Sequence, residues 1–196
     1  MKTAYFTSFG PGYIHFEDGL MTAITLPRAD RGSRAASRYD NTDIDGREAP
    51  RAPVPAAVYR IRRKLERYFR GEPTAFTPDE LPLDWDAWTP FQRDVARTML
   101  EIPWGETASY AELAAASGHA GAHRAVGNFM AANPFPVVFP CHRVVRSDGR
   151  TGRYSAGHGW KERLLALEGA EFGVAAPNEH AAGTRTRRSS FNRGRR

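Results

Sequence analysis

The stretch FPCHRVVRSDG, residues 139–149, holds the only cysteine of the chain, Cys141, between a proline and a histidine. A cysteine reacts as its thiolate, and nearby basic side chains favour that form by supplying positive potential. His142, Arg143 and Arg146 are such side chains, so the pattern predicts a nucleophile beside a base. Because neighbouring residues of an extended segment point to opposite faces, contact between His142 and the sulfur needs a bend or a bridging water.

Two other roles stay open for Cys141 at this point. Free cysteine is among the most buried residue types and is usually inert. A metal role is narrower, because a single cysteine excludes both an internal disulfide and a multi-cysteine zinc site, and the histidines show no ligand spacing. We therefore expect a free thiol and no bound metal.

Composition limits the class of protein. With 196 residues, of which 41% are hydrophobic and 26% charged, the chain reads as soluble and globular, with one domain or two small ones. It has no apolar run long enough for a bilayer and no basic-then-apolar leader at Met1. These features predict a cytoplasmic, nucleoid-associated protein.

The net charge of +6 is unevenly distributed. Residues 185–196 carry six arginines and no acid, so the remaining 22 basic and 22 acidic side chains of residues 1–184 cancel. Within that neutral body, residues 123–163 hold seven Lys or Arg against two acids. A basic cluster around Cys141 suits a polyanion; the alternative is a solvated arginine-rich surface.

The first part of the chain predicts a small β-meander followed by a helix. Three β-prone runs, at 3–9, 13–16 and 20–26, are separated by the turn signals Gly10-Pro11-Gly12 and Asp18-Gly19. Residues 28–55 are polar and without periodicity, which predicts a mobile loop. Residues 56–70 place apolar side chains on one helical stripe, with Gly71 as the stop.

The second part predicts helices. Thr89-Pro90 opens one, a capping box at Ser109 opens a short one that ends before Gly118, and a third spans about 123–132. The last two form a helix-turn-helix pattern, and a turn at Asp148-Gly149 is expected as its wing. Val137 to Phe139 is expected to be buried and extended, and a last helix spans about 159–170. Residues 173–196 predict a disordered basic tail.

From Phe91 to Glu168 the sequence resembles the catalytic domain of the O6-alkylguanine-DNA alkyltransferases, also called methylated-DNA–protein-cysteine methyltransferases. The matching pieces are FQRDV, IPWGETASYAELA, HRAVGNFMAANP, FPCHRVVRSDG, GRYSAG and KERLLALEG, in family order and spacing. The resemblance implies an α+β fold: an N-terminal domain over 1–88, then a mainly helical winged helix-turn-helix catalytic domain over 89–172. Before residue 89 only the organisation is similar.

The resemblance also implies a reaction: DNA repair by direct reversal, in which Cys141 takes a methyl or larger alkyl group from O6-alkylguanine in one irreversible step without a cofactor. O4-alkylthymine is a further candidate substrate. His142 matches the histidine that relays the thiol proton through a water, and Glu168 matches the acid that orients it. Tyr110 matches the tyrosine that donates to guanine N3.

Other positions match residues that meet DNA or the alkylated base. Arg124 matches the arginine that fills the stack once the base has been flipped out, and Gly127 and Ala131 keep that helix small enough for the minor groove of double-stranded DNA. Asn133 matches a hinge asparagine, and Lys161 a loop anchor. The substrate pocket is expected to include Asn133, the Val144 carbonyl, Tyr154 and the Ser155 amide. A monomer is expected, without a membrane partner.

Three competing readings are weaker. An alkyltransferase-like binding module would flip bases without chemistry, but that class replaces the cysteine. A helix-turn-helix regulator would explain Arg124 but not the combination of Cys141, His142 and Glu168. A cysteine hydrolase lacks support, because nothing resembles an oxyanion-hole glycine pattern.

Overall fold

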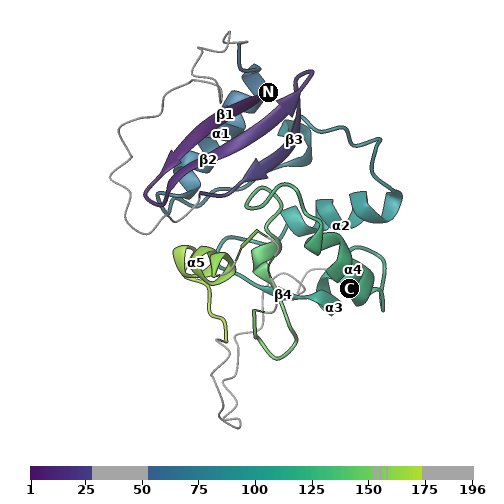
Figure 1. Cartoon of the computed structure of the whole chain (residues 1–196). Coiled ribbons are helices and arrows are strands. Elements are labelled where there is room, and N and C mark those ends of the chain that lie inside the picture. The colour runs from purple at the N-terminus through teal and green to yellow at the C-terminus, as the bar shows by residue number, and fades with distance from the viewer. Residues whose placement is uncertain (28–52, 152–153, 155, 158, 174–196) are drawn as a thin grey trace.

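A computed structural model describes residues 1–27, 53–151, 154, 156–157 and 159–173. The predicted loop at 28–55 lies outside this range except for its last three residues, as do Ser155 and the tail from 174 onward. The fold is α+β, as predicted: a three-stranded sheet with one helix is stacked on a unit of four helices (Figure 1).

The sheet is an antiparallel meander of β1 (Lys2–Thr7), β2 (Gly10–Glu17) and β3 (Leu20–Thr25). The turn at Asp18-Gly19 forms as predicted, with φ angles of 48° and 84°. The first turn lies earlier than predicted, at residues 8–9, and Gly10 already pairs with Thr7. The Thr7 hydroxyl closes this turn by donating to the Gly10 carbonyl at 2.8 Å and accepting from Phe9 N at 3.0 Å.

Helix α1 (Ala56–Tyr68) packs against the sheet through the stripe seen in the sequence. Val58, Ile61 and Leu65 on this stripe are fully buried, and Gly71 adopts φ 80° just past the helix end, a conformation that glycine takes without strain. A proline-rich crossing with the short helix η1 (Pro78–Glu80) then leads to the second unit. A backbone hydrogen bond ties this crossing to the sheet: Met21 N donates to the Pro82 carbonyl at 2.7 Å.

The second unit contains α2 (Pro90–Leu100), α3 (Tyr110–Ala116), α4 (His123–Ala131) and α5 (Trp160–Leu167). The N-cap predicted at Thr89 and the capping box predicted at Ser109 both form, with hydroxyl contacts of 3.3 and 3.1 Å to the N3 amides. Thr89 also forms a capping box, with Gln92. Strand β4 (Ala108–Ser109) pairs in parallel with β5 (Val144–Val145). The predicted wing turn is closed by Arg146 N donating to Arg150 O at 2.9 Å.

The approach to Cys141 differs from the prediction. Residues 137–139 are buried but turned, because Phe139 N donates to the Phe135 carbonyl at 3.0 Å and Val137 adopts φ 73°. Cys141–Arg143 then form a short 3-10 helix, η2. The surrounding prolines, 134, 136 and 140, lack amide hydrogens and so disfavour a regular strand here. After α5, the last described residue returns to the wing turn: Gly173 N donates to Gly149 O at 3.0 Å.

No helix in the described part of the chain is both long and apolar enough to cross a membrane.

The meander depends on Gly12, which lies in register with Tyr5 on the neighbouring strand. A Cβ at Gly12 would lie 2.1 Å from Cζ of the buried Tyr5 ring. We expect Gly12→Ala to lower the free energy of unfolding by about 1–3 kcal/mol, since the ring has to move in a packed core. Urea unfolding measures this. Gly127→Ala is the control, because its Cβ comes no closer than 3.8 Å to Tyr110; equal stability losses would contradict the prediction.

Candidate active site

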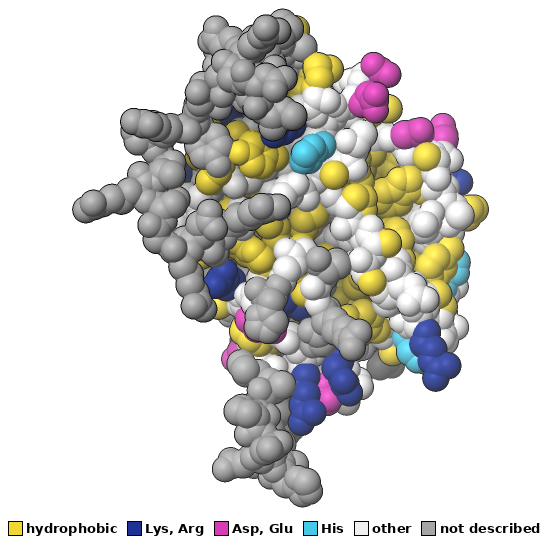
Figure 2. All heavy atoms as spheres, in the orientation of Figure 1, with side chains coloured by type: hydrophobic (Ala, Val, Ile, Leu, Met, Phe, Trp, Pro, Cys, Tyr) yellow, Lys and Arg dark blue, Asp and Glu magenta, His cyan; other side chains and the backbone are white. Residues whose placement is uncertain are grey.

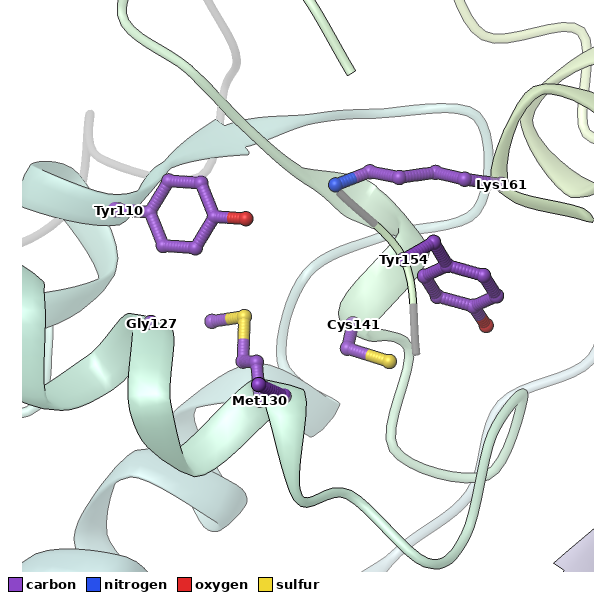
Figure 3. Close-up of a pocket in the computed structure, with 7 residues that line it drawn as sticks. Tyr110, Gly127, Met130, Cys141, Tyr154 and Lys161 are labelled. Atoms are coloured by element: carbon purple, nitrogen blue, oxygen red, sulfur yellow. The ribbon is translucent and has the colours of Figure 1, made fainter. Parts of the chain in front are cut away.

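Cys141 opens η2 at the wall of a cavity of about 400 Å³ between α3, α4 and α5 (Figure 3). Only 4% of the residue is exposed. The cavity is lined by Tyr110, Gly127, Met130, Ala131, Cys141, Tyr154 and Lys161. Of the residues predicted for the substrate pocket, Tyr154 lines this cavity, whereas Asn133 and Val144 do not. The remaining lining residues were predicted for catalysis, DNA contact or loop anchoring, except Met130, which was not predicted.

Asn133, just past α4, holds the cysteine in place. Its Nδ2 atom lies 3.0 Å from the sulfur and donates to the Phe139 carbonyl at 3.1 Å. Its Oδ1 atom accepts from Phe135 N at 3.0 Å. One amide thus links the helix-turn-helix to the cysteine turn, which is the geometry expected of a hinge. Asn133 does not line the cavity itself.

The thiol is protonated at rest, contrary to the expectation that its neighbourhood favours the thiolate. Burial raises the pKa of Cys141 above its ordinary value, and the Asn133 contact, the nearby Tyr154 hydroxyl and the Lys161 charge only partly offset this. The Tyr154 hydroxyl is close to the sulfur but outside hydrogen-bonding geometry with any described atom. The expected arginines do not help: Arg143 is bound to Glu168, and Arg146 is exposed beside Asp148.

His142 is fully buried and neutral. Burial lowers the pKa of His142, which outweighs the opposing effect of Glu168, and the Arg143 and Lys161 charges lower it further. Its Nε2 atom lies 2.7 Å from Oε1 of Glu168. Its Nδ1 atom is buried without a hydrogen-bond partner among the described residues. A carboxylate accepts only, so Nε2 carries the proton and Nδ1 has a free lone pair.

Glu168 follows the last residue of α5 and is buried. Burial alone would raise the pKa of its carboxyl, but hydrogen bonds and charges from His142 and Arg143 lower it from 4.5 to about 2. Arg143 donates from Nε to Oε2 at 2.8 Å and from Nη2 to Oε1 at 3.0 Å. Gly105 N donates to Oε2 at 3.2 Å. The carboxylate is therefore charged and fixed in orientation.

Tyr110 and Lys161 face one another across the cavity (Figure 3). Tyr110 is the first residue of α3, and burial raises the pKa of its hydroxyl, so it stays a proton donor. Lys161 donates from Nζ to the Val144 carbonyl at 2.6 Å, which fits a loop anchor. Burial lowers the pKa of Lys161 to about 8. The Val144 carbonyl predicted for the pocket thus already accepts one hydrogen bond.

Helix α4 presents two kinds of surface. Arg124, in its first turn, is exposed, whereas Gly127 and Ala131 line the cavity. Basic side chains also gather along the lower edge of the face shown in Figure 2. The helix that carries Arg124 is therefore also a wall of the cavity that holds the thiol.

Residues 90–170 match the family model "6-O-methylguanine DNA methyltransferase, DNA binding domain". A methylated-DNA–protein-cysteine methyltransferase of Mus musculus is 42% identical over 174 residues, covering 81% of this chain and 80% of that protein. One from Methanothermobacter thermautotrophicus is 39% identical, and the match covers 63% of its length. This chain belongs to the methylated-DNA–protein-cysteine methyltransferase family.

A solved structure of a family member is also similar. The crystal structure of Mycobacterium tuberculosis OGT in complex with DNA superposes with a TM-score of 0.62 at 32% identity, covering 85% of this chain and 91% of that one. The α+β fold of this chain is thus that of the methyltransferase family.

Two polar residues of the site were missed by sequence reasoning. Tyr68 on α1 donates to Oε1 of Glu168 at 2.6 Å, yet its helical spacing marks it only as core. Arg143, read as a source of positive potential at the sulfur, instead anchors Glu168 and donates to the Ile102 carbonyl at 2.6 Å. Among the described residues no cluster of three His, Cys, Asp or Glu could hold a metal.

The depressed pKa of Glu168 predicts a pH-dependent stability. The folded state binds this proton only near pH 2, against 4.5 for an ordinary glutamate. The contribution is thus complete above about pH 4.5 and is lost as the pH falls through about 2; it amounts to about 3 kcal/mol. Chemical unfolding between about pH 5 and pH 2.5 should show this loss. Glu168→Gln should be less stable at neutral pH, because it leaves the Arg143 charge unpaired. Its free energy of unfolding should also depend less on pH than that of wild type. Parallel pH curves for variant and wild type would show that Glu168 is not the source of this pH dependence.

Proposed function

We propose that this chain repairs DNA by moving a methyl or larger alkyl group from O6 of guanine to its own Cys141. The observation that carries the proposal is the position of the thiol: it lies at a cavity, next in sequence to a buried neutral histidine that Glu168 holds. Family membership supports the same chemistry, since relatives are named methylated-DNA–protein-cysteine methyltransferases.

The reaction is a single displacement. The sulfur attacks the alkyl carbon, a carbon–sulfur bond forms, and the carbon–O6 bond breaks with its electrons passing to the guanine. The thiol proton passes through a water to Nδ1 of His142, whose Nε2–H is held by Glu168. Tyr110 donates a hydrogen bond to guanine N3 as negative charge grows there. The thioether has no leaving path, so each molecule acts once.

The protonated resting state of Cys141 fits this scheme. A thiolate would react with any alkylating agent, whereas a buried thiol of raised pKa becomes nucleophilic only as its proton moves to His142. Protonation of His142 is favourable at that moment because the product imidazolium lies 2.7 Å from the Glu168 carboxylate.

The chain binds DNA through α4. The M. tuberculosis relative was crystallised with DNA, and the matched family model is named a DNA-binding domain. In our proposal α4 enters the minor groove, Arg124 fills the gap left by the flipped nucleotide, and small side chains at Gly127 and Ala131 permit close approach. Since those two residues line the cavity, the flipped base moves directly from the groove to the sulfur.

The remaining pocket assignments belong to the same proposal. Tyr154 lines the cavity, the second lone pair of the Val144 carbonyl contacts the base, and the Ser155 amide, outside the described residues, completes the set. The protein acts as a monomer in the cytoplasm on nucleoid DNA, without a cofactor.

Intact-mass spectrometry tests the transfer. Mixing wild type with duplex DNA containing O6-methylguanine should add one methylene equivalent per molecule, and the added mass should map to Cys141. Cys141→Ser should gain none yet still bind DNA, because a hydroxyl is a poor nucleophile at neutral pH and α4 is unchanged. A wild type that binds methylated duplex without gaining mass would favour the binding-module alternative.

Arg124→Ala separates base flipping from chemistry. The variant should slow repair of duplex DNA by about tenfold or more, and leave the rate with free O6-benzylguanine unchanged, because only the duplex needs its flipped base held out. Single-turnover kinetics on both substrates measure this. Arg60→Ala, which removes an exposed charge from α1, is the matched control. Equal losses on both substrates would place Arg124 in the pocket instead.

A further inference from the structure

The three-stranded sheet and α1 form the N-terminal unit of the chain. The last turn of α1 reaches from this unit to the proposed transfer site. The Tyr68 hydroxyl lies 2.6 Å from Oε1 of Glu168 and 3.2 Å from Nε2 of His142, and Tyr68 is fully buried. Its ring packs edge-on against Trp104 at 5.1 Å and against the His142 ring at 6.2 Å. This side chain thus touches both partners of the proton acceptor pair.

The protons of this cluster have only one consistent arrangement. Glu168 is ionised and accepts only, so both Tyr68 O–H and His142 Nε2–H donate to its Oε1 atom. Burial and the Glu168 charge raise the pKa of Tyr68 well above its ordinary value, so the phenol keeps its proton throughout the neutral range. His142 is left with Nδ1 as its only free acceptor.

We infer that Tyr68 is a positioning residue for alkyl transfer: by donating to Glu168 it holds His142 neutral, with Nδ1 ready to accept the thiol proton. The N-terminal unit thereby completes a site whose reacting groups all lie in the second unit. The inference rests on the proposed function, in which His142 takes the proton of Cys141.

A second contact of the same turn supports this role. Phe69 packs edge-on against Trp160, the first residue of α5, with ring centroids 6.1 Å apart. Tyr68 binds Glu168, which follows the last residue of that helix. Two consecutive residues of the N-terminal unit therefore fix both ends of α5, and with them the carboxylate that holds His142.

The electrostatic effect has a definite sign. His142 faces Glu168, which favours the imidazolium, and the Arg143 and Lys161 charges, which oppose it; Cys141 is its neighbour on η2. The Tyr68 proton shields part of the Glu168 charge. Without it the imidazolium is stabilised and the pKa of His142 rises, so less neutral histidine is present on the acid side of neutrality.

The test is the pH profile of single-turnover alkyl transfer from free O6-benzylguanine to the full-length chain. For Tyr68→Phe we expect the acid limb to move up by about one pH unit: the rate falls about tenfold at pH values well below the wild-type His142 pKa, but less than about threefold near pH 8.5. Tyr5→Phe is the matched control, because it removes a buried hydroxyl that donates to Thr25 O at 3.0 Å within the sheet. A Tyr68→Phe profile parallel to that of Tyr5→Phe would overturn the inference.

Histidine nitrogen NMR gives a readout independent of transfer. In wild type at about pH 7 the His142 signal, identified by its loss in His142→Asn, should show Nε2 protonated and Nδ1 bare. Wild type protonated on Nδ1 would overturn the inference even if Tyr68→Phe fails to fold. In folded Tyr68→Phe the His142 pKa should rise by about one unit, and an unchanged value would also overturn it. If wild type transfers no alkyl group, the proposed function fails, while these signals still decide whether Tyr68 controls His142.

Discussion

The buried carboxylate of Glu168 is the group on which the arrangement of the site depends. An ionised carboxylate inside a protein is tolerated only when donors surround it. Here Tyr68, Gly105, His142 and Arg143 supply them, from α1, the loop after α2, and η2. Any packing that displaced one of these segments would leave charge unpaired, so one acidic side chain fixes the relative positions of three parts of the chain.

That same charge decides how the thiol and the histidine divide one proton. Cys141 and His142 are both buried, and burial disfavours the charged form of each. The resting pair is therefore neutral thiol and neutral imidazole. In the proposed reaction, proton transfer creates two buried charges: the imidazolium lies next to Glu168, and the thiolate reacts at once with the alkyl group. The site thus stays unreactive until a substrate supplies the second half of the reaction.

Local signals in the sequence were sufficient for most of the fold. The caps at Thr89 and Ser109 and the stripe on α1 all formed, because each depends on residues within one turn of one another. The turn before Cys141 was mispredicted as extended, since an apolar run does not reveal that Phe139 N bonds back to Phe135 O. The first meander turn was misplaced because it precedes the glycines: the Thr7 hydroxyl closes it, and Gly10, at φ 102°, ends it instead of beginning it.

In the site too, residues within recognisable motifs could be predicted, whereas contacts between residues far apart in the sequence could not. Cys141, His142 and Glu168 could be assigned from motif resemblance, but Tyr68 is 100 residues from its carboxylate partner and looks like any other buried aromatic of an amphipathic helix. Arg143 was assigned the wrong effect, because its position next to His142 does not reveal that the side chain turns to Glu168.

The matched family segment begins at residue 90, yet the carboxylate that orients His142 takes one of its shortest hydrogen bonds from before that boundary. The proposed reacting groups thus all lie in the second unit, but their protonation state also depends on a residue of the N-terminal unit. A sheet-and-helix unit none of whose described residues lines the cavity still contributes to the proposed chemistry, because in a buried network each donor changes the charge that every other member experiences. In the proposed mechanism the N-terminal unit is therefore part of the proton relay as well as a support for α5.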